Sequence, residues 1–293
     1  MPIDILIQVA IGGVLIGGLY ALFAFGLSLI YGVARILNFS HGTLLAMGGI
    51  SGSVLYAAFG WNPLILLAVL VPAFFVFGCV FHWLLLEPLR KRSHFQMTIG
   101  TVLTTVGALI ILSDVAAALA GPRPRNIPLR FGVFEFGDVI VPVAQAYILI
   151  GIVVLTVVLH LFLQRSWFGR SIRAVTQNHV GATICGVRAG FVHALTFGLG
   201  SALAALAGVL YAMNFPVDPY SGFNLTVKAF TIIVLGGAGN LLGALAAGLF
   251  LGVSEAFTAF LWAPEWATAL SIVLLLVILV VFPRGFGGLR WRS

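Results

Sequence analysis

Long apolar stretches, each close to the length of a membrane-spanning helix, recur along this chain of 293 residues. A helix needs about 20 mostly apolar residues to cross the hydrocarbon core of a bilayer. Eight stretches meet this requirement, at about 5–31, 40–60, 63–86, 97–120, 140–163, 191–214, 240–261 and 266–283. The pattern predicts an all-α fold: one polytopic transmembrane helical bundle of about eight spans, which forms a single domain over residues 1–293.

Charged residues are scarce, since Lys, Arg, Asp and Glu make up 8% of the chain against about 25% in soluble domains. A soluble surface requires charge, so this composition excludes a soluble enzyme, a nucleic-acid-binding domain and a disordered protein. The net charge of +7 comes from short cationic runs between apolar stretches, which is the pattern of membrane topology. We therefore expect the lipid bilayer, and no nucleic acid, among the partners.

The cations of alternate loops predict the orientation of the chain. One set of loops holds Arg35, Arg90, Lys91, Arg92, Arg165, Arg170, Arg173, Arg188, Arg284, Arg290 and Arg292, and the other holds Arg123, Arg125, Arg130 and Lys228. Cytoplasmic loops carry an excess of Lys and Arg, and the first set has eleven of the 15 cations. This bias places the N-terminus outside and the C-terminus in the cytoplasm.

A ninth apolar stretch, 226–238, is too short for a crossing and runs into Gly236-Gly237-Ala238-Gly239-Asn240. A helix break at membrane depth is tolerated only where it is buried in protein or lines a cavity. We therefore expect a discontinuous or re-entrant helix near 226–261, with Gly236, Gly237 and Gly239 at the break. Half-helix ends of this kind bind charged groups in transporters, although close helix packing also explains the glycines.

Residues 164–190 form the largest expected cytoplasmic loop. The sequence from Ser171 to Ile184 predicts a helix with Ser171 as its N-cap. One side of it would carry Ile172, Val175, His179, Ala182 and the nearby Val187. Such a helix can dock into a groove of a cytosolic partner; the residues alone favour a solvated connector instead.

Polar residues inside or beside the spans are further candidates. Asn38 or Ser40 can cap the helix that follows, and His41 lies in its first turn, so a structural role is favoured over substrate contact. Thr98, Thr101 and Thr105 share a helix face, which indicates either a polar path or hydroxyls bonded to their own helix. His82, His160 and His193 lie near span ends without metal-ligand spacing, so we expect interfacial positions and no metal site.

Asp114 and Glu255 are the acids nearest the membrane interior. Intramembrane acids are functional hypotheses by default, but both lie close to an expected external helix end, where the charge can reach water. One hypothesis is therefore that the chain is an autonomous ion-coupled secondary carrier, in which Asp114 or Glu255 carries the coupling proton or ion. The sequence contains no P-loop GxxxxGK[ST], so we expect no enzyme activity and no cofactor.

Five stretches, taken together and in this order, resemble the permeases of bacterial branched-chain amino acid ABC importers, specifically the H-type subunit of the Liv system. They are GLSLIYGVARILNFSHGTLLAMGG (26–49), TIGTVLTTVGALIIL (98–112), FGRSIRAVTQNHVGATICGV (168–187), FGLGSALAALAGVLYA (197–212) and TVKAFTIIVLGGAGNLLGALAAG (226–248). The resemblance implies a permease subunit in the bacterial inner membrane. Its implied partners are a second permease of similar fold, two cytosolic ATPase subunits and an extracytoplasmic substrate-binding protein.

The resemblance also implies roles for individual residues. Segment 168–187 becomes the coupling segment, with Arg170, Arg173, Gly181 and Gly186 at matching positions, which reverses the preference for a solvated connector. The substrate would follow an alternating-access path lined by Asn38, Ser40, His41, Thr98, Thr101 and Asn240. Family substrates are leucine, isoleucine, valine and related amino acids, while close relatives import urea or short amides. The sequence departs from the family at 121–142 and at His179, where these loops often have proline before an acidic residue.

Overall fold

The computed structural model describes residues 3–91, 93–128, 132–137 and 139–281. Eight of its helices are long and apolar enough to cross a membrane: α1 (Ile3–Ala34), α2 (His41–Phe59), α3 (Pro63–Phe81), α4 (His94–Ala120), α5 (Val143–Arg165), α8 (Ala189–Ala212), α10 (Leu241–Leu261) and α11 (Pro264–Val281). Each overlaps one of the expected stretches, so the all-α bundle of about eight spans is confirmed. Arg92, Arg130, Arg284, Arg290 and Arg292 lie outside the described residues.

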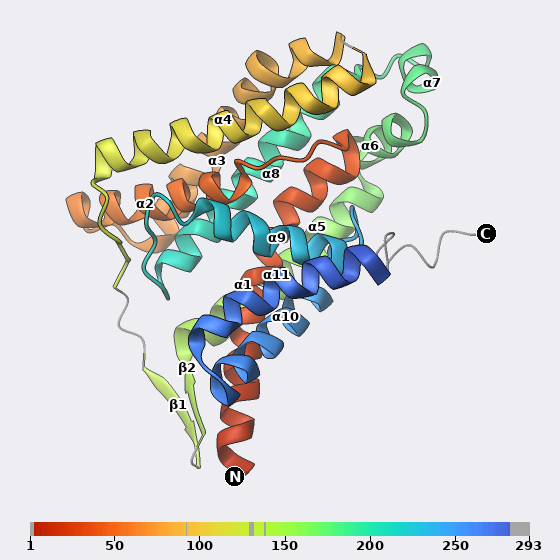
Figure 1. Ribbon diagram of the computed structural model, residues 1–293. Coiled ribbons are helices and arrows are strands. Elements are labelled where there is room, and N and C mark those ends of the chain that lie inside the picture. The colour runs from red at the N-terminus through yellow and green to blue at the C-terminus, as the bar shows by residue number, and fades with distance from the viewer. Residues whose placement is uncertain (1–2, 92, 129–131, 138, 282–293) are drawn as a thin grey trace.

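Helix α1 forms the centre of the bundle and packs against α5, α8 and α10 (Figure 1). Its Gly13 and Gly17 face Gly248 and Gly252 of α10: a Cβ built on Gly17 would lie 2.8 Å from the carbonyl oxygen of Gly248. Facing pairs of small residues four positions apart let two helix backbones approach closely in a membrane. This contact places the first and the last third of the chain side by side.

The discontinuous helix expected near 226–261 consists of α9 (Gly222–Gly236) and α10, separated by residues 237–240. With 15 residues, α9 is about 22 Å long, which is shorter than the hydrocarbon core of about 30 Å. Helix α9 packs against α1, α2, α10 and α11. Helix α9 is therefore surrounded by protein on several sides, as a short helix at membrane depth requires, and Gly237 at the start of the interruption is buried while residues 238–240 are exposed.

One end of the bundle carries a short β-hairpin, β1 (Val133–Phe136) and β2 (Val139–Pro142), in which Val133 pairs with Pro142. The side chain of Gln8 forms two hydrogen bonds with the backbone of Ile140, of 2.7 and 2.8 Å, so the hairpin lies beside the start of α1. The sequence predicted no strands here, between the expected spans 97–120 and 140–163. Four-residue strands of Val, Phe and Ile give too short a pattern to distinguish from an apolar loop.

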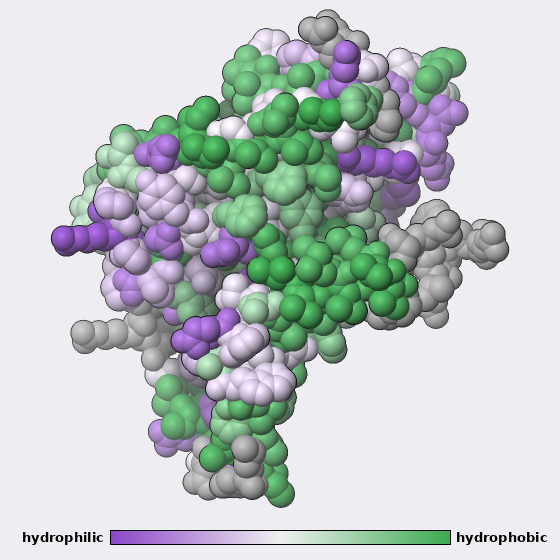
Figure 2. Space-filling model, viewed as in Figure 1, coloured by the Kyte–Doolittle hydropathy of each residue, from purple (hydrophilic) through white to green (hydrophobic). Residues whose placement is uncertain are grey.

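The opposite end carries α6 (Trp167–Gln177) and α7 (His179–Ile184) (Figure 1). Hydrophilic side chains gather over this end, whereas a broad apolar surface covers α11 (Figure 2). The single helix expected from Ser171 to Ile184 was wrong, because Asn178 adopts an extended conformation and caps α7 through a bond from the Gly181 amide. The N-cap of α6 is Ser166 rather than Ser171.

Candidate functional site

The turn between α1 and α2 holds Asn38, Ser40 and His41, all of which are fully buried. Asn38 Oδ1 accepts hydrogen bonds from the amide (3.1 Å) and the hydroxyl (2.7 Å) of Ser40. Ser40 occupies the N-cap position of α2 but its side chain makes no capping bond. The expectation that Asn38 or Ser40 caps the helix was therefore wrong, because the two side chains bond each other.

Residues from other helices complete this turn. The Gly42 amide, in the first turn of α2, donates to Thr226 Oγ1 of α9 over 2.9 Å. His41 Nε2 lies 2.9 Å from the carbonyl oxygen of Phe23 in α1; since a carbonyl only accepts, this nitrogen carries the proton. The turn thus joins α1, α2 and α9 by polar contacts that satisfy buried backbone groups.

The threonines of α4 take three different environments. Thr98 is exposed and Thr101 is buried, and Thr101 Oγ1 donates to the Met97 carbonyl of its own helix over 2.7 Å. Thr105, which is fully buried, lies one turn further along, with its hydroxyl 3.3 Å from the carbonyl oxygen of Leu37. The structure therefore brings Thr105, rather than Thr98, to the buried turn.

The interruption between α9 and α10 lies against α1. Gly237 and Gly239 have φ values of 87° and 81°, which glycine adopts without the steric cost that other residues incur. The Gly239 amide donates to Ser28 Oγ of α1 over 3.0 Å. Asn240 is exposed and caps α10, its side chain accepting a bond from the Gly243 amide. The break is thus fixed by glycine conformation on one side and by a capping residue on the other.

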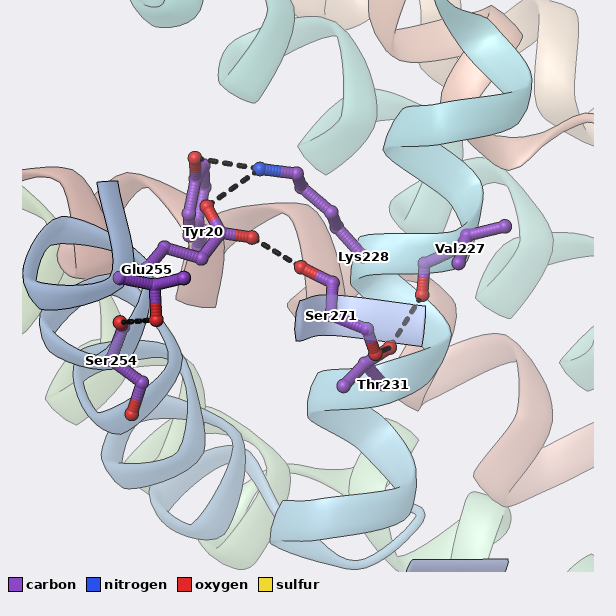
Figure 3. Close-up of polar contacts among 8 residues, drawn as sticks. Tyr20, Val227, Lys228, Thr231, Ser254, Glu255 and Ser271 are labelled. Carbon is purple, nitrogen blue, oxygen red and sulfur yellow. Dashed lines mark hydrogen bonds and ion pairs between the residues drawn. The ribbon is translucent and has the colours of Figure 1, made fainter. Parts of the chain in front are cut away.

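Lys228 lies within α9, not in an external loop as its place in the charge pattern predicted. Its Nζ is 2.7 Å from Glu255 Oε2 of α10 and 2.8 Å from the Tyr20 hydroxyl of α1 (Figure 3). Ser271 of α11 donates a hydrogen bond to the other carboxylate oxygen of Glu255. We call Tyr20, Lys228, Glu255 and Ser271 the ion-pair network; it ties four helices together and leaves Glu255 5% exposed.

Placing Lys228 in a helix changes the charge pattern. The loop set with fewer cations falls from four to three, so the asymmetry between the two ends becomes larger. The two acids nearest the membrane interior also differ in environment. Asp114 is exposed and accepts a weak 3.4 Å hydrogen bond from the Tyr220 hydroxyl, whereas Glu255 is buried and forms an ion pair with Lys228.

Helices α6 and α7 present two different faces. Val175 and Ala182 are buried in an apolar cluster with Val33 and Val192, and Ile172 and Val187 pack against it. Three other large apolar side chains of these helices are exposed: Trp167 (70%), Val180 (67%) and Ile184 (81%). Four of the five residues expected on one side thus pack on the bundle and His179 is exposed, while a second set of large apolar side chains remains uncovered in a polar segment.

The four residues expected to couple this segment to a partner have local structural roles as well. Arg173 donates to the carbonyls of Leu163 and Gln164 at the end of α5 (2.6 and 3.1 Å). The Arg170 guanidinium lies over the Trp167 ring. Gly181 packs beside the Asn178 side chain, and Gly186, with φ 85°, ends α7 in the left-handed conformation.

Comparison with known proteins agrees with this architecture. A family model described as branched-chain amino acid transport system / permease component matches residues 9–279. This chain belongs to that permease family.

The permease is 31% identical to the high-affinity branched-chain amino acid transport system permease protein LivH of Salmonella typhimurium, over 96% of this chain and 95% of that protein. It is 32% identical to the corresponding protein BraD of Pseudomonas aeruginosa, with the same coverage. A probable LivH protein of Methanocaldococcus jannaschii is 25% identical over 96% of this chain.

Sequence reasoning missed two polar features of the permease, Thr226 and the ion-pair network. Thr226 gave no signal, because one hydroxyl in an apolar run normally bonds its own helix. Lys228 did give one: a single cation at the start of the apolar stretch 226–238 indicates a residue that needs a buried acidic partner. Glu255 was the acid available to it.

Proposed function

We propose that this permease is the membrane-spanning subunit of an ATP-driven importer of branched-chain amino acids. The match of almost the whole chain to relatives named for branched-chain amino acid transport carries the proposal. ATP hydrolysis belongs to partners, since the sequence has no P-loop. The complete importer contains a second permease of similar fold, two cytosolic ATPase subunits and an extracytoplasmic substrate-binding protein.

The coupling segment is α6 and α7, within 164–190. Large apolar side chains that are exposed together mark protein contact sites, and Trp167 of α6 and Val180 and Ile184 of α7 are each exposed on this segment. Arg170 and Arg173 lie on the same exposed segment. These five residues are suited to a groove on the ATPase with an apolar floor and an acidic rim.

The permease lies in the bacterial inner membrane with α6 and α7 in the cytoplasm. Five of the cations expected inside lie at the end of the bundle that holds α6 and α7: Arg35, Arg165, Arg170, Arg173 and Arg188. The first turn of α1 lies at the opposite end, beside the β-hairpin. The proposal therefore places the N-terminus outside and the C-terminus in the cytoplasm.

The translocation path runs where α2, α4 and the interrupted helix meet. Asn38, Ser40 and His41 are buried there, with Thr101 nearby along α4, while Thr98 and Asn240 lie at exposed positions. Because Asn38, Ser40, His41 and Thr101 are buried, rocking of the bundle is needed to open the path alternately to each side. Low affinity along the path lets the substrate leave, while the binding protein provides selection.

The coupling proposal is tested by replacing Gly186 with leucine. A side chain strains the left-handed turn that ends α7 and misplaces the exposed apolar group, so ATPase stimulation by loaded binding protein should fall at least about tenfold, which corresponds to about 1.4 kcal/mol. Gly151→Leu, in α5 and open on all sides, is the matched control. Stimulation that remains unchanged in Gly186→Leu, with normal membrane insertion, would contradict the assignment.

The substrate and the rival carrier are tested in proteoliposomes. The complete importer should move leucine, isoleucine and valine only with ATP, and urea or acetamide should not compete. The permease alone should transport no leucine in response to a proton or sodium gradient. The buried acid Glu255 is already paired with Lys228 at 2.7 Å, and binding a proton or sodium ion there would break this buried ion pair. Ion-driven leucine uptake by the isolated permease would establish the carrier instead.

A further inference from the structure

A cavity of about 180 Å³ lies behind the coupling segment. It is lined by residues from the end of α1, the 3-10 turn Glu87–Lys91, the start of α4, helices α6 and α7, and the start of α8. It opens to the cytoplasmic side, where Arg35, Thr176 and His179 are exposed. No residue of the expected translocation path lines this cavity, so it is distinct from that path.

Two arginines give the cavity an excess of positive charge. Arg35 ends α1 with φ 53°, a left-handed conformation that is uncommon for residues other than glycine. Its side chain is exposed and lines the cavity. Arg90 donates to His179 Nε2 over 2.8 Å and lies 3.5 Å from Glu87. Because a guanidinium has five N–H donors, Arg90 keeps donors for a further acceptor.

A buried histidine adds an unsatisfied polar group. His193 lines the cavity and is 7% exposed, and its Nδ1 has no hydrogen-bond partner within the described part of the chain. Its ring lies 6.5 Å from His179 and 6.2 Å from His82, centroid to centroid. His82 and His193 were expected at separate interfacial positions, and His179 on one side of the helix expected from Ser171 to Ile184; the fold stacks the three rings. A buried polar group of this kind normally has a partner.

The lining of the cavity also includes apolar side chains. Val33, Ile36 and Val175 are buried there, and Met97 is half-buried. A cavity of about 150 Å³ accommodates benzene, so this one, which is open at the surface, accommodates a ligand of about seven non-hydrogen atoms, or a slightly larger one that extends into its opening. Cationic donors and aliphatic side chains in the same cavity fit a small aliphatic carboxylate, whereas a nucleotide is too large.

We propose that this cavity binds an aliphatic α-amino acid through its carboxylate, and that the ligand is the imported product. The carboxylate accepts hydrogen bonds from Arg35 and Arg90, and the aliphatic side chain lies against Val33, Ile36 and Met97. The identity of the ligand as product rests on the proposed function. The site itself rests on the cavity and its charge.

An occupied cavity restrains the coupling segment. The ligand would bridge the end of α1 to the turn that carries Arg90, and Arg90 is bonded to His179 of α7. Val175 and Thr176 of α6 line the same cavity. Because the ligand stabilises the conformation in which these parts meet, product in the cytoplasm opposes the movement of α6 and α7 that transmits ATP hydrolysis.

The first test is direct binding. The permease assembled with its ATPase subunits, without binding protein, is titrated with radiolabelled leucine in nanodiscs. Arg35→Gly, which removes the guanidinium and relieves the backbone strain, should weaken binding at least about tenfold, as should Arg90→Gln. Arg123→Gln, in the loop at the opposite end, is the control and should bind leucine normally. Isovalerate should compete and leucinamide, which lacks the carboxylate, should not.

The second test measures feedback. With binding protein already saturated, millimolar leucine on the ATPase side should lower stimulated ATP hydrolysis in the native importer and in Arg123→Gln, and have no effect in Arg35→Gly. If the arginine variants instead lose the ATPase subunits while leucine binding is unchanged, an acidic side chain of the partner occupies the cavity and the proposal is overturned.

The proposed function and the proposed amino acid site can be refuted independently of each other. Leucine transport by an importer that shows no leucine binding at the cavity overturns this inference and leaves the proposed function intact. Leucine binding that depends on Arg35 and Arg90, in an importer that does not transport leucine, overturns the proposed substrate and leaves the site.

Discussion

Helices α8 and α5 are both long and apolar, yet they occupy opposite environments. Of the most apolar 18 residues of α8, 67% are buried within the protein, against 11% in α5. The buried helix has the lower mean hydropathy. Helix α8 is built largely from alanine and glycine, whereas α5 is rich in valine, leucine and isoleucine.

This inversion follows from the bilayer as a solvent. Lipid is as apolar as a leucine side chain, so burying leucine against another helix brings little gain. Close approach of backbones brings contact and weak polar bonds instead, and it requires small residues. In this permease the most hydrophobic helices therefore face lipid, while helices with glycine, alanine and serine form the centre.

The ion-pair network offers the strongest test, because it joins the centre of the bundle to the lipid-facing α11. Lys228→Met leaves Glu255 as a buried acid without its cation, which should lower the free energy of unfolding by about 3–5 kcal/mol. The double variant with Glu255→Gln should recover much of this loss. Thermal unfolding in detergent measures both, and equal stability of the single variant and the native protein would refute the network.

A methyl group added to each kind of helix tests the packing directly. A Cβ on Gly208 of α8 would collide with the backbone carbonyl of Leu45 in α2, so Gly208→Ala should cost about 1–3 kcal/mol. Gly151→Ala in α5 meets no atom and should be neutral or slightly stabilising, since alanine is the better helix former. If both changes have the same effect on the unfolding temperature, the contrast between α8 and α5 is wrong.

Two buried threonines give the smallest and most specific contrast. Thr226→Val removes the acceptor of the Gly42 amide and leaves a buried N–H without a partner, at a cost of about 1–2 kcal/mol. Thr156 of α5 donates only to the Ile152 carbonyl of its own helix, so Thr156→Val should change the stability by less than about 0.5 kcal/mol. Hydrogen exchange at the Gly42 amide provides a second measurement, and it should accelerate only in Thr226→Val.

Much of the architecture was predictable from local pattern. Apolar length located the eight spans, and the glycines at 236, 237 and 239 located the interruption, because both signals are carried by consecutive residues. The apolar side of 172–187 was also predictable, although the helix is divided at Asn178. The capping roles expected for Asn38 and Ser40 failed because the α2 amide at Gly42 is satisfied by Thr226, 184 residues away.

The sequence by itself determined that this chain spans a membrane, where its helices are, where one breaks, and which family it resembles. Only the tertiary structure decided that Lys228 pairs with Glu255, that Thr226 completes the start of α2, and that His82, His179 and His193 stack beside a cationic cavity. The physical reason is that hydropathy and helical periodicity describe how each segment meets its solvent. They do not specify which helices pack against each other, and the polar sites of this permease lie at contacts between helices.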